Sequence, residues 1–410
     1  MSTWLLPRLD LTPDQLRFVE IPPDKHRVVL GFPGSGKTQI LIHRADYLSK
    51  TYSLSADRYR VFVFTNVIKE YIRSGIQFLG LPEESVSTFD HWCRLIYESH
   101  ISRRLPRRER SIDFDQIRTS VLELFRKEPK LQKTLDFVLV DEGQDLTAQA
   151  YEILSLAAQH ITVFADPQQQ IFDNGTSIPV IMEKLGLNRN NAALLGAYRN
   201  APYVAQLASK FIEDDQKRSQ YLLQVNKEQK VREHPLCFVA PNHEKEMDRL
   251  AEIVSQRQAM NEQIGIIVPT NRQVFGFAKG LEQRGVKVER AAAGRDNSYD
   301  FNNSLPKIVT YFSAKGLTFD SVLLPRLTES AFSWIEDNDL RSRIFFVGIA
   351  RATQWAYLST VEDKEFSEMD IIREAENAGH VTVQSISDIG ITDSGGKKPG
   401  EDFEDDFSVL

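Results

Sequence analysis

The sequence predicts an α/β fold with two domains, each built on a mostly parallel sheet covered by helices. Two series of short, β-branched apolar runs alternate with longer amphipathic stretches along the 410 residues. Such runs are typical of strands that are buried on both faces, as they are in parallel sheets. A glycine-rich segment, GFPGSGKT, stands between the first of these runs and an amphipathic stretch. Parallel α/β proteins commonly bind phosphate at such a place.

The apolar runs divide the chain into two domains and a tail. In a first domain at residues 1–193 we expect strands at 27–32, 60–65, 137–142 and 161–166. In a second domain at residues 194–380 we expect strands at 236–241, 264–269, 286–291, 307–312 and 321–327. The first domain also carries a short insertion at about residues 93–135. Residues 381–410 are rich in glycine, serine and acids, which predicts a disordered acidic tail.

Composition narrows the class of protein. Hydrophobic residues make up 41% and charged residues 26% of the chain, as in ordinary soluble globular proteins. The net charge of −7 argues against a protein that coats nucleic acid indiscriminately, although it leaves room for a local basic groove. Cys93 and Cys237 form neither a metal-binding spacing nor a disulfide framework. With no signal peptide and no apolar run long enough to cross a membrane, we expect a cytoplasmic protein.

The segment GFPGSGKT has the pattern of a phosphate-binding loop, and the strand before it and the helical pattern after it are the context that such a loop requires. Backbone N–H groups of Gly34, Ser35 and Gly36 would surround phosphate oxygens at the positive end of a helix. Lys37 would reach the β- and γ-phosphates, and the Thr38 hydroxyl would bind Mg²⁺. A chance glycine-rich turn is the weaker alternative.

A second segment, FVLVDEGQD at 137–145, adds the groups that hydrolysis needs. We expect Asp141 to hold Mg²⁺ and Glu142 to orient or deprotonate the attacking water. A lone acidic pair after a strand often serves only as a solvated helix cap, but its pairing with the loop favours a nucleotide hydrolase. The nearest approach to a guanine-reading motif, NKEQ at 226–229, lacks the aspartate. ATP is therefore the expected nucleotide.

The order of short motifs resembles that of superfamily 1 DNA helicases of the UvrD, Rep and PcrA type. Between about residues 11 and 360 the chain contains, in order, LTPDQ, VFTN, STFDHW, DEGQD, ADPQQQIF, AYRN, TYFSAKGLTFD and VGIARA. The resemblance implies two RecA-like P-loop NTPase domains with ATP bound in the cleft between them. It also implies a compact member, because the insertions that enlarge the family's proteins are short here.

The resemblance also implies roles at the nucleotide for residues of both domains. Gln15 would read the adenine, Tyr198 would lie near it, and Gln169 would sense the γ-phosphate. Arg199 and Arg351 would act as arginine fingers. The remaining nucleotide contacts would come from Gly316 and from Thr318, which stands where the family has a ribose-binding glutamate.

Contacts to DNA are implied at the two early motifs, at TYFSAKG and at a basic run. The motif residues are Phe64, Thr65, Asn66, Thr88, Phe89, His91 and Ser313. The run RRLPRRER contributes Arg103, Arg104, Arg107 and Arg108 as candidate contacts to the phosphate backbone. For this run a solvated loop is the competing interpretation, and Trp92 beside the second motif is a candidate core residue.

Two departures from the family pattern affect the expected activity. Asn174 stands where relatives have a tryptophan that stacks on a base, and Phe312 replaces a histidine. Our first hypothesis is an ATP-driven translocase or helicase on single-stranded or tailed DNA, moving 3′ to 5′ and unwinding weakly alone. The alternative is a regulatory ATPase that senses nucleotide or DNA ends for a partner nuclease or other effector, for example in bacterial phage defence.

Overall fold

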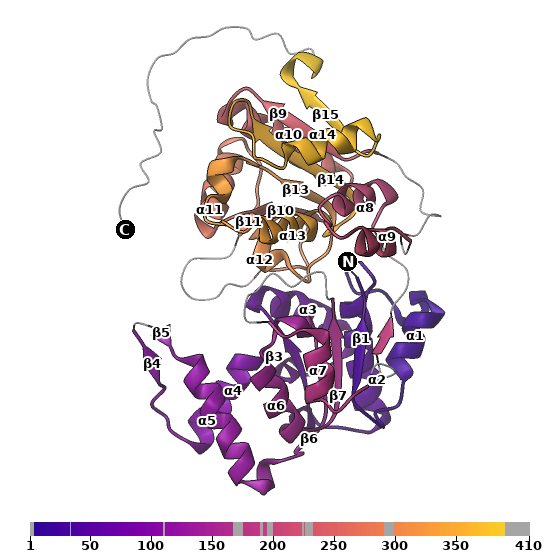
Figure 1. The fold of residues 1–410 in the computed structure, drawn as a ribbon, viewed down its shortest axis with the longest axis vertical. Helices are drawn as coiled ribbons and strands as arrows, with labels where there is room; N and C mark the ends of the chain where they lie inside the picture. Colours follow the sequence, from indigo (N-terminus) through magenta and orange to yellow (C-terminus); the bar gives the residue numbers. More distant parts are fainter. Residues whose placement is uncertain are drawn as a thin grey trace.

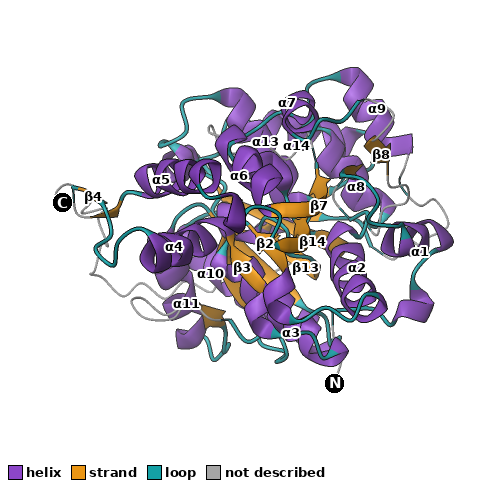
Figure 2. Ribbon diagram, turned by 90° about the horizontal axis from the view of Figure 1, so that it is seen from below, coloured by secondary structure: helices purple, strands orange, loops and turns teal. Residues whose placement is uncertain are grey.

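The computed structural model describes residues 4–32, 34–109, 111–166, 175–188, 192–194, 200–223, 225, 233–290 and 299–389. Two sheets, each with all its strands parallel, form the centres of two lobes that lie one above the other in Figure 1. Figure 2 shows the strands at the middle of the molecule with helices outside them. The predicted α/β class is confirmed.

The first sheet has the strand order β3-β2-β6-β7-β1-β8. Its strands are β1 (Arg27–Leu30), β2 (Tyr59–Val63), β3 (Val86–Thr88), β6 (Leu135–Val140), β7 (Ala158–Ala165) and β8 (Ala192–Leu194). The four strands predicted here correspond to β1, β2, β6 and β7. Each ends before its predicted limit, because the last residues of the apolar run turn out of the sheet into a loop.

Helices cover the first sheet, and all except the first of them, which precedes β1, follow the carboxyl end of one of its strands. They are α1 (Pro13–Glu20), α2 (Lys37–Thr51), α3 (Asn66–Leu79), α6 (Ala148–Ala157) and α7 (Ile178–Lys184). Threonine side chains cap three of them by accepting a backbone N–H of the first turn, and the caps are Thr12, Thr65 and Thr147. Such caps define where each helix starts and therefore where its first residues lie.

The predicted insertion forms a separate projection. It consists of α4 (Phe89–His100), a two-stranded hairpin of β4 (Arg107–Arg108) and β5 (Ser111–Ile112), and α5 (Phe114–Lys127). The two helices pack against each other, while the hairpin extends away from both sheets in Figure 1. Arg107 and Arg108 of the basic run therefore lie in a hairpin strand, whereas Arg103 and Arg104 lie in the irregular segment before it.

The second sheet has the order β11-β12-β10-β13-β14-β9-β15. Its strands are β9 (Leu236–Ala240), β10 (Ile264–Val268), β11 (Glu289–Arg290), β12 (Lys307–Thr310), β13 (Phe319–Leu324), β14 (Ala352–Val361) and β15 (Thr382–Ser385). Its helices are α8 (Pro202–Ser209), α9 (Asp215–Leu223), α10 (His243–Ala259), α11 (Asn271–Gln283), α12 (Tyr311–Ala314), α13 (Asn338–Ile349) and α14 (Met369–Asn377).

Three expectations for this half of the chain were wrong. The strand predicted at 307–312 ends at Thr310, whose hydroxyl accepts the Ser313 N–H and so starts α12. The long strand β14 was not predicted. The tail was predicted to begin at residue 381, but β15 pairs with the edge of β9. The domain limits otherwise stay a prediction, and residues 390–410 lie outside the described part.

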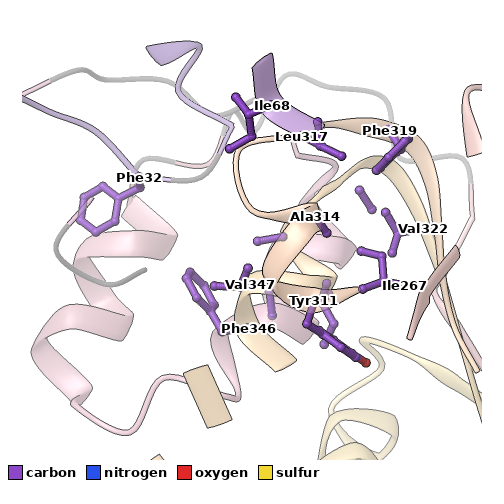
Figure 3. Packing of buried hydrophobic residues seen from close by; sticks show 14 of the residues in the cluster. Phe32, Ile68, Ile267, Tyr311, Ala314, Leu317, Phe319, Val322, Phe346 and Val347 are labelled. Atoms are coloured by element: carbon purple, nitrogen blue, oxygen red, sulfur yellow. The ribbon is translucent and has the colours of Figure 1, made fainter. Parts of the chain in front are cut away.

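One hydrophobic cluster joins the two lobes. It contains Ile40 and Ile68 of the first lobe together with Leu317, Tyr311 and Ile267 of the second. Figure 3 shows Ile68 beside Leu317, with other second-lobe side chains, among them Ala314 and Tyr311, below them in the view. Helix α12 lies against α3 at this seam. The apolar cluster thus holds the carboxyl ends of the two sheets close together. No helix among the described residues is long and apolar enough to cross a membrane.

A buried basic cluster fixes α1 to the first sheet. The Arg44 guanidinium is fully buried and donates hydrogen bonds to the backbone carbonyls of Phe18, Val19 and Ile21 at the end of α1. It also contacts His160 Nε2 at 3.1 Å. Burial, helped by the positive charge of Arg44, lowers the pKa of His160 to about 3. The native state therefore holds this imidazole neutral.

This pKa predicts a pH dependence of stability. Because the unfolded chain binds a proton at His160 below about pH 6.5 and the folded chain does not, the free energy of unfolding falls as the pH falls through that range. Between pH 7 and pH 5 the loss from this group is about 2 kcal/mol. Urea unfolding should show this loss in the parent chain and a flatter dependence in His160→Asn. The exposed His100→Asn serves as the control, and an equal slope in parent and His160→Asn contradicts the assignment.

Candidate nucleotide-binding site and nucleic-acid surface

The glycine-rich loop runs from the end of β1 to the start of α2. Gly34 and Gly36 adopt φ values of 77° and 83°, which side chains with a Cβ rarely tolerate. The Lys37 ammonium is buried within the loop, where it donates to the carbonyls of Gly31 (2.7 Å) and Phe32 (3.1 Å). The Ser35 hydroxyl is also buried and has no hydrogen-bond partner among the described residues. The loop therefore holds a cation and unsatisfied polar groups at a helix N-terminus.

The carboxylates after β6 face this loop. Thr38 Oγ1 donates to Asp141 Oδ2 at 3.0 Å, which joins the first turn of α2 to the end of the strand. Glu142 follows with φ 49° and ψ 46°, a left-handed conformation unusual for glutamate. Gln144 Nε2 donates to Glu142 Oε2 at 2.6 Å and holds the carboxylate in place. Strained residues of this kind cluster at functional sites.

The two adjacent carboxyl groups respond in opposite ways to their surroundings. Burial and the neighbouring charge of Glu142 raise the pKa of Asp141 to about 7. Burial also opposes ionisation of Glu142, but the positive charges of Lys37, Lys315 and Arg351 outweigh it and lower the pKa of this carboxyl. Glu142 is therefore held as a carboxylate, which is the form that can accept a proton from water.

The second lobe supplies two of those cations. Arg351 follows α13 and is 3% exposed, and its guanidinium donates to the carbonyls of Val347 (3.1 Å) and Leu317 (3.3 Å). Lys315 lies directly after α12 and donates to Asp145 Oδ1 at 2.7 Å. Both side chains of that ion pair are fully buried. The pair bridges the two lobes beside Glu142.

A pocket opens between these groups and is lined from both lobes. The first-lobe loop contributes Gly34, Ser35, Gly36, Lys37 and Thr38. Glu142 also lines the pocket, and the second lobe adds Gly316, Thr318 and Arg351. The remaining lining residues come from outside the predicted site and are Trp4, Gln39 and Tyr71. The geometry brings together the groups that the sequence placed in separate motifs.

Of the four other predicted nucleotide contacts, one is described by the structure and does not line the pocket. Gln15 is 7% exposed and is engaged in the α1 cap: its Oε1 accepts from the Thr12 N–H and its Nε2 donates to the Ser35 carbonyl. The other three, Gln169, Tyr198 and Arg199, lie outside the described residues. Asn200, next to Arg199, donates to the carbonyls of Ala350 and Ala352 on either side of Arg351.

The residues present fit a magnesium nucleotide. The hydroxyl of Thr38 and the carboxylate of Asp141 are hard oxygen ligands of the kind that Mg²⁺ prefers. The unpartnered Ser35 hydroxyl, the glycines and the buried Lys37 ammonium fit phosphate oxygens. Such a site can hold the phosphates of a magnesium nucleotide.

Several residues of the site were missed by the sequence analysis. Gln144, Asp145 and Lys315 lie inside the quoted motifs, but their roles became visible only from their contacts. Trp4 and Tyr71 lie outside every motif. The only sequence feature that could have suggested a role for them is that both are aromatic, and nothing in the sequence indicated that the two rings meet.

The predicted DNA contacts of the first lobe gather at one edge. β2 and β3 are adjacent parallel strands, so Thr65 and Asn66 after β2 lie beside the end of β3, where Thr88 is the last strand residue and His91 follows. Asn66 and His91 are exposed, whereas Phe64, Thr65 and Thr88 are half-buried. Ser313 lies on α12, which packs against α3 across the seam.

Phe89 requires a correction. It is 3% exposed and its ring packs edge-on against Phe62, with Trp92 beside both in the same cluster. A ring buried in this way has no face left for a base, because its surroundings already fill the contact. Trp92 is likewise a core residue, as the alternative interpretation expected.

Four arginines of the basic run are accessible to solvent. Its candidate contacts, all exposed, are Arg103, Arg104, Arg107 and Arg108. Within the part of the chain that the structure describes, none of their guanidinium groups forms an ion pair, whereas most other surface arginines do. Unpaired cations on a projecting hairpin and on the segment that leads into it suit a polyanion. Arg110 lies outside the described residues.

Comparisons with known proteins agree with the geometry of the first lobe. Residues 11–107 and 104–185 match the family model described as the UvrD/REP helicase N-terminal domain. A probable DNA helicase II homolog of Mycoplasma capricolum is 26% identical over 151 residues, which are 33% of this chain and 21% of that protein. The ATP-dependent DNA helicase srs2 of Schizosaccharomyces pombe is 24% identical over 185 residues, 42% of this chain and 21% of that protein. The match thus spans about a fifth of each relative's length.

One solved structure, the C-terminal domain of a possible DNA helicase from Lactobacillus plantarum WCFS1, is 17% identical to this chain. The match covers 46% of this chain and 99% of that one, with a TM-score of 0.35. At so low a TM-score the likeness carries no argument about the fold.

The buried bridge between the lobes predicts a large effect on stability. Lys315→Met leaves Asp145 buried without its partner, and breaking such a pair costs about 3–5 kcal/mol. We expect a clearly lower midpoint of thermal unfolding, partly recovered when Asp145→Asn is added. The exposed Lys364→Met is the matched control. A Lys315→Met chain as stable as the control contradicts a structural role for the bridge.

Proposed function

We propose that this chain, whose residues 11–107 and 104–185 match the UvrD/REP helicase N-terminal domain, is a helicase of this type that hydrolyses ATP with Mg²⁺ and moves along single-stranded DNA. The observation that supports this most directly is the shared pocket. The phosphate loop and Glu142 come from one lobe, and Arg351 and Thr318 come from the other. Hydrolysis in such a pocket requires both lobes and therefore couples to their relative movement.

In this proposal each group of the pocket has a distinct task. Lys37, Thr38 and Asp141 hold the magnesium nucleotide, and the Glu142 carboxylate takes the proton of the attacking water. Arg351 places positive charge where negative charge develops on the phosphoryl group, which contributes factors of about 10³–10⁵ to the rate in related phosphoryl transfers. Bound Mg²⁺ supplies further charge neutralisation.

Four further residues keep the roles that the motif resemblance implies. Gln169 and Arg199 complete the γ-phosphate contacts. Gln15 and Tyr198 serve the adenine. For this role the side-chain amide of Gln15 would have to bind the adenine in addition to its hydrogen bonds with Thr12 and Ser35.

We propose that single-stranded DNA lies across the edge formed by Phe64, Thr65, Asn66, Thr88 and His91, and continues to Ser313 on the second lobe. These positions lie at the ends of neighbouring strands and on either side of the seam, so movement of the lobes would change the spacing of the contacts. Polarity from 3′ to 5′ is proposed from the family resemblance alone.

We propose that the isolated chain unwinds duplex weakly. Between α4 and β6 the described insertion contains only the hairpin and α5 besides short turns. Asn174, outside the described residues, cannot supply the stacking ring of relatives, which is worth about 1–3 kcal/mol per base. Each step forward must also resist reclosing of the duplex, at about 1.4 kcal/mol per base-pair step. A partner protein that supplies a wedge would improve unwinding.

The test of the function is the ATPase rate with and without single-stranded DNA, together with strand displacement on a tailed duplex of about 20 base pairs. We expect strong stimulation by DNA and little displacement by the chain alone. Absence of stimulation would favour the alternative, a regulatory ATPase that senses nucleotide or DNA ends for an effector. Efficient single-turnover unwinding would contradict the proposal of a weak motor.

The assignment of Glu142 predicts a separable defect. Glu142→Gln should bind nucleotide like the parent but lose at least about 100-fold in turnover, because proton transfer by a positioned base contributes that much. Lys37→Ala should lose binding as well as turnover. Equilibrium binding and steady-state hydrolysis distinguish the two variants. Parental turnover in Glu142→Gln would remove this residue from the reaction.

The basic hairpin predicts a salt-dependent effect. Replacing Arg103, Arg104, Arg107 and Arg108 by glutamine should weaken DNA binding for every sequence and reduce the salt slope of the affinity, since phosphate contacts release counterions. The matched control replaces Arg126 and Arg373, which are exposed but paired with acids. An unchanged slope would indicate that the hairpin is only solvated.

A further inference from the structure

An aromatic pair forms one wall of the nucleotide pocket. The rings of Trp4 and Tyr71 stack with their centroids 4.1 Å apart and an angle of 21° between the planes. Tyr71 is 3% exposed, whereas Trp4 is only half-buried and keeps part of its indole free. Both residues line the pocket.

Polar contacts hold Trp4 in this position. Its indole Nε1–H donates to the Tyr71 carbonyl and to Ser74 Oγ, both at 2.9 Å. Its own carbonyl accepts from Gln39 Nε2 at 2.6 Å, and Gln39 Oε1 accepts the Leu6 N–H at 3.0 Å. Gln39 directly follows the phosphate-binding turn, so the loop and the indole are tied to the same helix.

The backbone of α3 leaves room for this ring. A Cβ on Gly75 would lie 2.6 Å from Trp4 Cζ2, so no larger residue fits there without displacing the indole. Because glycine costs about 1 kcal/mol relative to alanine inside a helix, its presence here is explained by the ring that it accommodates. The position of Trp4 is thus determined by contacts with two helices, α2 and α3, not by chance packing at the surface.

The wall also reaches the second lobe. The Tyr71 hydroxyl lies 3.0 Å from Thr318 Oγ1. The Tyr71 ring meets Phe301 edge-on with centroids 5.1 Å apart. Trp4, Tyr71 and Thr318 therefore form one contact chain across the seam, apart from Glu142 and Arg351, which would face the terminal phosphate.

We propose that the Trp4 side chain contacts the nucleoside part of a nucleotide bound in this pocket, and that Tyr71 positions Trp4 for this contact. This inference rests on the proposed nucleotide site. The indole N–H is already bonded, so the remaining surface of the ring offers an apolar π-face. Such a face contacts the base or sugar of a nucleotide but contributes nothing to bare phosphate. The structure thus assigns a contact to Trp4 that no motif of the chain contains.

The test compares two probes that share a phosphate part, Mg²⁺-ADP and Mg²⁺-pyrophosphate, by calorimetric titration of the full chain without DNA. Trp4→Ala should weaken ADP binding at least about fivefold, because fivefold corresponds to the smallest affinity loss expected when one base–aromatic stack is removed. Pyrophosphate binding should stay within about twofold of the parent, which also shows that the loop remains folded. Trp4→Phe should recover part of the ADP affinity.

Gly75→Ala provides a second variant that keeps the tryptophan but displaces it. It should reproduce the selective loss of ADP affinity even though alanine favours the helix. Trp334→Ala, which removes a half-exposed tryptophan outside the pocket, is the matched control and should bind both probes like the parent.

The outcomes separate this inference from the proposed function. Unchanged ADP binding in Trp4→Ala overturns the inference alone. An equal loss for ADP and pyrophosphate also overturns it, because Trp4 then acts only by supporting the loop. A parent chain that binds neither probe contradicts the nucleotide site itself, and the assignment of Trp4 with it.

Discussion

The two lobes of this protein depend on each other through buried charge. Four first-lobe carboxyl groups are buried at the carboxyl ends of β6 and β7, and they are Asp141, Glu142, Asp145 and Asp166. The first lobe places one buried lysine, Lys37, near them, and Lys315 and Arg351 come from the second lobe. Removing charge from water is costly unless opposite charges compensate it. The ionised state of the candidate active site is therefore a property of the assembled molecule.

The same seam is also apolar, which explains how the charges stay out of water. One hydrophobic cluster continues from Ile68 on α3 to Leu317 and the second sheet. Because the dielectric constant is low inside the protein, a buried cation attracts nearby carboxylates more strongly than a cation at the surface does. A change in the distance between the lobes alters packing and ionisation together. A nucleotide bound in the shared pocket would act on both, since Tyr71 and Glu142 of the first lobe and Thr318 and Arg351 of the second all line it.

The surface proposed for DNA is organised by sheet topology instead. Parallel strands end at the same edge, so residues distant in sequence, Thr65 and Thr88, cap neighbouring helices side by side. The hairpin with Arg107 and Arg108 lies apart from that edge, at the end of the insertion (Figure 1). The two regions differ in chemistry: the edge presents hydroxyl, amide and imidazole groups, while the hairpin presents unpaired guanidinium groups. A nucleic acid that contacts both regions would be held at the hairpin by the charge of its phosphates. At the strand edge it would be held by the shape of the contact surface.

The sequence by itself determined the fold class, most strands of both sheets and the groups around the phosphate loop, because these depend on local patterns: apolar runs and glycines that permit positive φ. It did not indicate β14, whose residues lie within and after a motif, or the end of β12 at Thr310, where a capping hydroxyl overrides an apolar run. Only the tertiary structure decided that Phe89 is core, that Lys315 pairs with Asp145, and that Trp4 lines the pocket. Those outcomes depend on contacts between distant segments, which no local pattern encodes.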